Sequence, residues 1–377
     1  MIIAILLSVL IGYVYEDTDS LIVINDTLVI CGTHQYNIKV HITNKGILKV
    51  RQWSGAADST GWLLLNAPLI LIQDSSSING SESGYWGGDT SHPDGYGPGY
   101  GGAGGISGGA GGGAGYGGDG GNGGDYYGGA GGSAYGDPLD TLIDIGSGGG
   151  AGCYTTYVVD GFGGSGGVMT YLKAQQITID SSYIETNGED GHVGTLLGFE
   201  AGGGGSGGGI MIWADSAIIH NSVMNANGGN GANSELGGGG GAGGGRIKIF
   251  YTTSLDTSDI VLLVQGGTGG IGFQGIDGDS GMPGSIHIEP IVGITEIANT
   301  VTKNFYIHSN PVKDIAKITC ANTPLKLHLY DVSGRLVKTI WLKNNTEFVH
   351  LNDLEQGVYF LKSNKENKPA HKIILLK

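Results

Sequence analysis

Residues 174–191 read AQQITIDSSYIETNGEDG, and residues 214–231 read ADSAIIHNSVMNANGGNG. A shift of 40 positions aligns the first stretch with the second. In this alignment small residues, apolar residues and an Asn-Gly pair occupy equivalent positions in both stretches. The shift pairs Ala174 with Ala214, Ile179 with Ile219, Ser182 with Ser222, Tyr183 with Val223, Ile184 with Met224, and Asn187 with Asn227. A third copy follows at a shift of 38, where Leu262 falls on Met224. An internal period of this length is typical of stacked architectures.

Each copy contains short apolar or alternating runs, which indicate strands rather than helices. Similar runs occupy residues 21–24, 27–30, 36–42 and 46–50, and a looser relative of the repeat covers residues 62–72. Such strands bury their apolar side only when equivalent strands stack on one another. We therefore predict an all-β chain in which residues 20–298 form a parallel β-helix, or solenoid, with glycine-rich loops. In this respect the body resembles glycine-rich parallel β-helix surface proteins.

Glycine supplies 77 of the 377 residues, whereas an ordinary globular protein contains about 7%. The densest stretch is an insertion at residues 84–136, where 27 of 53 residues are glycine and many follow a Gly-Gly-X pattern. One interpretation is a flexible loop. The other is a set of extended three-fold helices of the polyproline II type, packed so closely that only glycine fits. In the second form the stretch resembles the polyglycine bundles of some phage adhesin tips and of a glycine-rich antifreeze protein.

The formal net charge of −15 is distributed unevenly. Residues 299–377 hold 12 Lys and Arg against 6 Asp and Glu, which leaves 7 basic and 28 acidic residues in 1–298. This contrast indicates two separately built modules. The acidic body has no basic stripe for a phosphate backbone, so the charge pattern argues against nucleic acid as a partner.

The chain begins with an apolar run at residues 2–11 that is too short to span a bilayer but suits the core of a secretory signal. No Lys or Arg precedes the run, and acidic residues follow it at Glu16 and Asp17. We predict a signal peptide within residues 1–15, with a buried first strand as the alternative. No later segment reaches the length of a transmembrane helix.

The C-terminal module carries three motifs in order. They are Ser309-Asn310-Pro311, then LHLYDVSGRLV at 327–337, then LEQGVYFL at 354–361, and the chain ends in KIILLK. These residues resemble the C-terminal sorting domain of proteins exported by the bacterial type IX secretion system, with Asn310, Pro311, Gly334 and Gly357 as its motif positions. The resemblance implies a small antiparallel β-sandwich at residues 299–377 that the outer-membrane machinery reads and often removes after export. It implies a secreted or outer-membrane-attached cell-surface protein. A carbohydrate-binding or purely structural sandwich is the alternative.

Patterns for catalysis are weak. Gly-Gly-Ser-Gly-Gly at 163–167 and 204–208 fits a nucleophile elbow, but such matches arise easily among so many glycines and lack the strand-turn-helix context. A polysaccharide-cleaving solenoid needs converging carboxylates. The repeat offers one candidate pair, Asp180 beside His220, which a polar row on the solvent side explains more simply. The sequence does not support catalysis.

Several acidic residues have the chemistry of calcium ligands. They are Asp119, Asp125, Asp137, Asp140 and the carboxylates of the turn at 277–281. Their spacing matches neither the calcium-binding nonapeptide repeat nor the calcium loop of helix-flanked sites. We interpret them as solvated turn residues and predict no cofactor, with calcium left as an open alternative.

Aromatic residues dominate the large side chains of the glycine-dense insertion. They are Tyr85, Trp86, Tyr96, Tyr100, Tyr116, Tyr126, Tyr127 and Tyr135. Flat rings with a polar tip suit stacking on sugars or contact with another surface. The alternative is that they pin the glycine run to the body.

These observations favour a non-enzymatic function. The leading hypothesis is an exported structural and adhesive protein of the cell surface or extracellular space, which binds polysaccharide or cell-surface glycans. The predicted contact residues are Tyr85, Trp86, Tyr96, Tyr100, Tyr116, Tyr126 and Tyr127. Two alternatives stay open, a polysaccharide lyase or glycoside hydrolase of the β-helix type and an ice- or mineral-binding protein.

Overall fold

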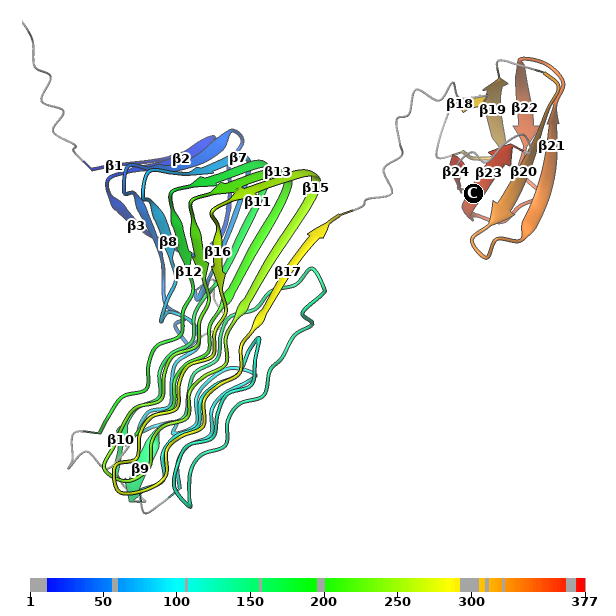
Figure 1. Ribbon diagram of the computed structural model, residues 1–377. Coiled ribbons are helices and arrows are strands. Elements are labelled where there is room, and N and C mark those ends of the chain that lie inside the picture. The colour runs from blue at the N-terminus through cyan, green and yellow to red at the C-terminus, as the bar shows by residue number, and fades with distance from the viewer. Residues whose placement is uncertain are drawn as a thin grey trace, which may run out of the picture. The chain divides into compact units, whose positions relative to one another are not determined.

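The computed structural model forms two compact units, Met1–Gly293 and Ile294–Lys377. It describes residues 12–55, 60–105, 108–155, 158–194, 201–291, 305–308, 312–320, 323–363 and 371–376. Every regular element in these ranges is a strand, as Figure 1 shows, which confirms the predicted all-β class. Most of the predicted signal peptide at 1–15 lies outside the described residues, and Tyr13–Glu16 form the first strand, β1.

Unit 1 contains two main sheets. The long sheet holds, in spatial order, β1 (Tyr13–Glu16), β2 (Ser20–Ile24), β5 (Lys39–Thr43), β7 (Trp62–Ile72), β11 (Met169–Asp180), β13 (Gly209–His220), β15 (Arg246–Ser258) and β17 (Ser285–Pro290), and β4 (Gly32–Gln35) also pairs with β7. The short sheet holds β16 (Val261–Leu263), β14 (Val223–Asn225), β12 (Tyr183–Glu185), β8 (Ser77–Asn79), β6 (Ile47–Val50) and β3 (Thr27–Ile30). A separate antiparallel pair consists of β9 (Gly152–Thr155) and β10 (Val158–Gly161).

The repeat sets the register of both sheets. Ala174 of β11 lies opposite Ala214 of β13, and Tyr183 of β12 lies opposite Val223 of β14, as the shift of 40 predicts. Met224 lies opposite Leu262, as the shift of 38 predicts. The pairing is parallel throughout these strands, whereas β1 joins β2 antiparallel.

One apolar core lies between the two sheets. Its side chains form ladders, such as Leu65, Leu172, Ile212 and Ile249, which face one another in β7, β11, β13 and β15 and are fully buried. The short sheet contributes the ladder of Ile78, Ile184 and Met224 to the same core. Each strand alone would leave these side chains in water, so burial depends on the stacking of copies.

Each passage from the long sheet to the short sheet turns on a residue in the left-handed conformation. The φ angles lie between 47° and 58° at Asn25, Asn44, Asp74, Ser181, Asn221 and Asp259. Asn and Asp tolerate this conformation because their short polar side chains bond locally. The corner residue therefore repeats along the sequence with the strands.

The glycine-rich segments form a third part of unit 1, the glycine bundle. It comprises the described residues of 84–136, 146–151, 163–167, 186–191, 202–208, 226–245 and 264–284. Within it, residues three apart bond to the same neighbouring segment. The N–H groups of Gly111 and Ala114 donate to the carbonyls of Ala201 and Gly204. The N–H groups of Gly112 and Gly115 donate to the carbonyls of Gly102 and Gly99 in a different segment. A period of three is that of the polyproline II helix. The packed alternative, not the flexible loop, is the arrangement observed, and Figure 1 shows these segments running side by side away from the sheets.

Unit 2 consists of two antiparallel sheets. One holds β18 (Phe305–Ile307), β19 (Ile315–Cys320) and β22 (Thr346–His350), and the other holds β21 (Leu336–Leu342), β20 (Leu325–Asp331), β23 (Gly357–Ser363) and β24 (His371–Leu375). Inward residues of both sheets, including Ile318, Leu327 and Leu361, share one buried core. This is the small antiparallel arrangement that the resemblance to the sorting domain implies.

Candidate binding surfaces

Three of the predicted contact residues meet around a tryptophan that the sequence analysis did not single out. The ring centroid of Trp53 lies 4.8 Å from Tyr85, 5.2 Å from Trp86 and 5.6 Å from Tyr96. The cluster is fixed by the backbone, because the Tyr96 N–H donates to the Trp86 carbonyl. All four rings are partly exposed, and burial raises the pKa of Tyr85. The cluster is a packed group of aromatic rings, each of which is partly exposed.

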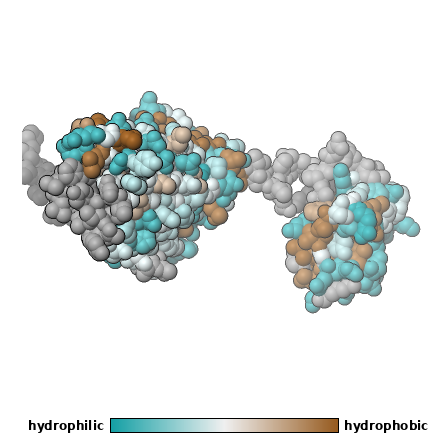
Figure 2. Space-filling model, turned by 90° about the horizontal axis from the view of Figure 1, so that it is seen from below, coloured by the Kyte–Doolittle hydropathy of each residue, from teal (hydrophilic) through white to brown (hydrophobic). Residues whose placement is uncertain are grey.

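A second group comes from turns of the glycine-rich segments, which Figure 1 shows running away from the two sheets. We call it the apolar tip and define it as Tyr126, Tyr127, Leu236, Phe273 and Ile276. The first two are 87% and 52% exposed, and Phe273 and Ile276 are 65% and 58% exposed. Figure 2, seen from below, shows brown hydrophobic patches among teal hydrophilic ones on the body.

Backbone bonds hold the segments of the apolar tip together. The Gly124 N–H donates to the Gly238 carbonyl, and the Gly238 N–H donates to the Ile276 carbonyl. The Gly105 N–H donates to the Tyr127 carbonyl. The tip therefore draws on turns from three distant parts of the sequence. The sequence pattern indicated its tyrosines but not Leu236, Phe273 or Ile276. Phe273 and Ile276 are two of the large apolar residues in the last glycine-rich turn.

The other two predicted contact residues differ from one another. Tyr100 is 47% exposed and stays available at the surface. Tyr116 is fully buried, its hydroxyl accepts the Asp144 N–H at 2.8 Å, and the Arg246 guanidinium lies 5.4 Å from its ring centroid. Burial raises the pKa of Tyr116 well above its usual range. A contact role for Tyr116 does not fit this position, because the ring supports the interior of the bundle.

Two buried cations organise the segment between Tyr135 and Leu142. Arg246 donates to the carbonyls of Tyr135 and Gly136. The Lys248 ammonium donates to the carbonyls of Asp137, Asp140 and Leu142 and to an Asp140 carboxylate oxygen, at 2.6–2.9 Å. The hydrogen bond from Lys248 holds the pKa of Asp140 below its usual range. These side chains are structural anchors, and their partners could not be read from the sequence because most are backbone carbonyls.

The acidic residues considered for calcium bind backbone or amide groups instead. Asp119 accepts the Ala134 N–H, Asp125 accepts the Tyr126 N–H, Asp137 accepts the Leu139 N–H, Asp277 accepts the Gly272 N–H, and Asp279 accepts the Asn122 amide. Across the described ranges, no three His, Cys, Asp or Glu side chains gather in a way that could hold a metal ion. The pair of Asp180 and His220 lies in register, but the His220 Nε2 atom faces Asp256 at 3.4 Å.

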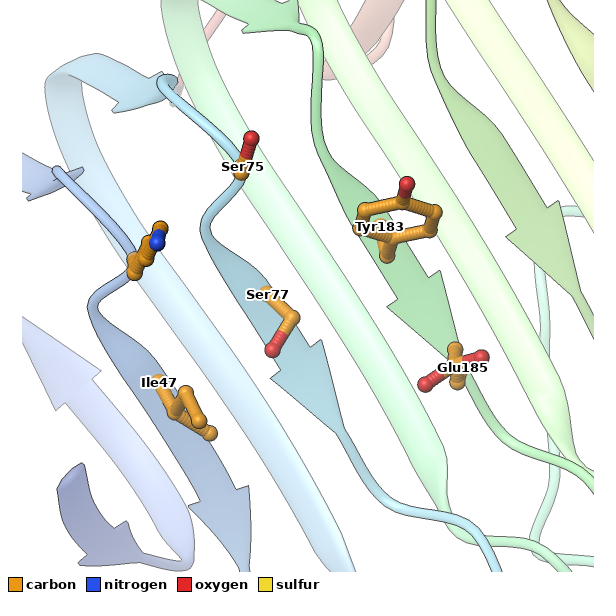
Figure 3. A pocket seen from close by; sticks show the side chains of 6 residues that line it. Ile47, Ser75, Ser77, Tyr183 and Glu185 are labelled. Carbon is orange, nitrogen blue, oxygen red and sulfur yellow. The ribbon is translucent and has the colours of Figure 1, made fainter.

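A shallow hollow of about 470 Å³ lies on the outer side of the short sheet (Figure 3). Ile47, Ser77 and Tyr183 face one another in β6, β8 and β12. The small Ser77 side chain between two larger neighbours leaves the hollow, and Lys45 and Glu185 complete its rim. The lining of this hollow therefore includes the exposed ring of Tyr183 and the opposite charges of Lys45 and Glu185.

Unit 2 presents a basic-aromatic face on the outward side of β20, β21, β23 and β24. Its outward residues include Lys326, His328, Tyr330, Thr339, Trp341, Phe360, Lys362 and Lys372, beside the apolar Leu336, Val358 and Ile374. The Lys326 ammonium lies 5.3 Å from the Trp341 ring centroid. The outward positions of these four described strands hold no carboxylate.

The predicted sorting motif is only partly described. Gly334 has a φ of 80° in the turn between β20 and β21, where its N–H donates to the Asp331 carbonyl. Gly357 begins β23. Asn310 and Pro311 lie outside the described residues.

Comparison with known proteins identifies this unit. Residues 306–377 match the family described as the secretion system C-terminal sorting domain. No curated protein and no solved structure matches the chain. The match confirms the predicted type IX sorting domain, so the protein interacts with the secretion machinery and is secreted or located at the cell surface. In the part of the chain that the structure describes, no helix has the length and hydropathy to cross a membrane.

Proposed function

We propose that this exported chain is a structural and adhesive surface protein that holds the apolar tip out on the rigid glycine bundle. The exposure of the tip carries the proposal, since Tyr126 is 87% and Phe273 65% exposed. Contiguous exposed apolar side chains mark surfaces that contact another molecule. Aromatic rings with polar hydroxyls stack on sugar rings and accept varied partners, so cell-surface glycans are the contact class that we propose.

The stacking of copies supports a finer description of the body. Each copy contributes a long-sheet strand, a short-sheet strand and a glycine-rich excursion, in parallel register with the copy before it. We infer that the body is a β-solenoid in which the glycine bundle replaces one wall. In this description the tip turns belong to the glycine-rich excursions that follow β8, β14 and β16.

The test compares the full chain with a variant carrying Tyr126→Ser, Tyr127→Ser and Phe273→Ser on a glycan array and on whole cells. The matched control is Tyr13→Ser, a residue that is 49% exposed in β1. We expect the tip variant to lose binding and the control to keep it. Equal binding by the tip variant and the unmodified chain would refute the adhesive role.

A second candidate function is binding to a regular solid surface such as ice or a mineral. It is favoured by a ladder of exposed side chains, in which Asp190 accepts the Asn230 N–H and Asn230 accepts the Thr268 N–H. The Asn187, Asn227 and Gln265 positions repeat this pattern. To test this candidate, ice growth and mineral adsorption are measured with the unmodified chain and with Asn230→Ala. The candidate is wrong if the unmodified chain neither changes ice growth nor adsorbs to the mineral.

A further inference from the structure

A groove crosses the outer side of the long sheet, far in the sequence from the residues of the apolar tip. It has a volume of about 380 Å³ and crosses β7, β11 and β13. Lys173 of β11 lies opposite both Asn66 of β7 and Trp213 of β13. The next row contains Pro68, Gln175 and Asp215. The far wall comes from Gln35 at the end of β4 and from Asn37.

The side chains that project into the groove come from these two outward rows. Between the rows, Ala67, Ala174 and Ala214 face one another across β7, β11 and β13. These alanines belong to the apolar core on the inward side of the sheet, where Ala67 and Ala214 are buried.

The polar groups of the two outward rows are available. The side chains of Asn66, Lys173 and Gln175 have no hydrogen-bond partner among the described residues, and Asp215 uses one oxygen to accept from Thr252. Trp213 is partly exposed beside them. Two amides, one ammonium, one carboxylate and one indole thus line the same groove.

We propose that this groove is a binding subsite for a neutral polysaccharide chain. The apolar face of a pyranose ring stacks on an indole, and its hydroxyl groups pair with amides, which both donate and accept. Lys173 and Asp215 balance one another in charge, which favours a neutral glycan over a strongly anionic one. A shallow groove that crosses several strands fits an extended chain better than a small enclosed ligand.

The test measures the retention of the full-length protein by affinity electrophoresis in gels that contain mannan, starch or soluble xylan. Three proteins are compared with the unmodified chain: Trp213→Ala, the double variant Asn66→Ala with Gln175→Ala, and the control Trp341→Ala on unit 2. The double variant changes partly exposed polar side chains, so it keeps the test valid where Trp213→Ala alters folding. We expect at least one polysaccharide to retard the chain, with affinity about tenfold weaker in both groove variants and unchanged in the control.

The proposal is overturned if none of the three polysaccharides retards the unmodified chain, or if the double variant is retarded as strongly as the unmodified chain. The apolar-tip variant separates this outcome from the proposed adhesive role. Retention that is lost only in the tip variant supports the tip and refutes the groove. Retention that is lost only in the groove variants supports the groove and refutes binding of these polysaccharides at the tip.

Discussion

At the scale of single residues, glycine in the bundle is required by distance rather than by flexibility. A Cβ atom on Gly112 would lie 2.1 Å from the Ala130 carbonyl oxygen, and one on Gly203 would lie 2.0 Å from the Gly112 carbonyl oxygen. Both neighbours are backbone, which cannot move aside without breaking its own hydrogen bonds. The exposed X positions of the Gly-Gly-X pattern, such as Asp119 and Asn122, carry side chains instead.

The change Gly112→Ala should therefore destabilise the body strongly. We expect the free energy of unfolding to fall by about 1–3 kcal/mol or more, as for overpacked cores. Denaturant unfolding of the full chain measures it. The control Ala130→Ser, at an exposed X position, should change little, and equal stability of the two variants would contradict close packing.

The Glu189 and His192 pair gives the body a pH dependence. Burial raises the pKa of Glu189, but hydrogen bonds from His192 and the Ser165 N–H outweigh it and lower the pKa below 4.5. The hydrogen bond to Glu189 raises the pKa of His192 above 6.5, against a smaller opposing effect of burial. The stabilisation from Glu189 is lost as pH falls through its lowered pKa, and that from His192 is lost as pH rises through its raised pKa.

We therefore expect this pair to stabilise the body most between pH 4.5 and 6.5. Thermal unfolding across the pH range should show a fall in Tm above pH 6.5 that is smaller in His192→Gln. Curves that run parallel for the two proteins would show that the pair contributes nothing.

At the scale of elements, the Lys248 anchor fixes residues 137–142 against β15. The ammonium satisfies three carbonyls and one carboxylate, and its side chain is 1% exposed. Removing the cation leaves these acceptors without their donor.

For Lys248→Met we expect a loss of about 1–3 kcal/mol and faster proteolysis between residues 137 and 142. The control Lys173→Met changes an exposed lysine on β11 and should leave the proteolysis rate unchanged. Cleavage at the same rate in both variants would show that the anchor does not hold the segment.

The elements differ in how far the sequence predicts them. The repeat predicts the register of β11, β12, β13 and β14 because equivalent residues in parallel strands must stack. The left-handed residues between the long and short sheets and the buried ladders of the core recur with the same repeat. The partners of the glycine segments were not predictable, because Gly111 bonds to Ala201 and Gly240 through backbone atoms that leave no trace in the side-chain pattern. For the same reason the burial of Tyr116 and the role of Trp53 appear only in the structure.

At the scale of the whole molecule, the two units have different charges and different tasks. The body is acidic, whereas unit 2 is basic and carries the sorting domain. Three lysines of unit 2 and three of its aromatic rings lie on the basic-aromatic face: Lys326, Lys362, Lys372, Tyr330, Trp341 and Phe360.

Removal of residues 306–377 should abolish export in a host with type IX machinery, with the body retained in the periplasm. The double change Lys326→Glu and Lys362→Glu should reduce export, because it reverses charge on the basic-aromatic face. The control Lys343→Glu lies outside that face and should export normally. Surface delivery of the truncated chain would refute the role of the tail.

Hydrogen exchange of the backbone amides at residues 110–116 tests the whole account most directly, since both the tip and the proposed adhesion need a rigid support. If each glycine segment is bonded to its neighbours, these amides should exchange as slowly as those of β13. Exchange at the rate of an unstructured peptide, while β13 stays protected, would contradict the bundle and the function built on it.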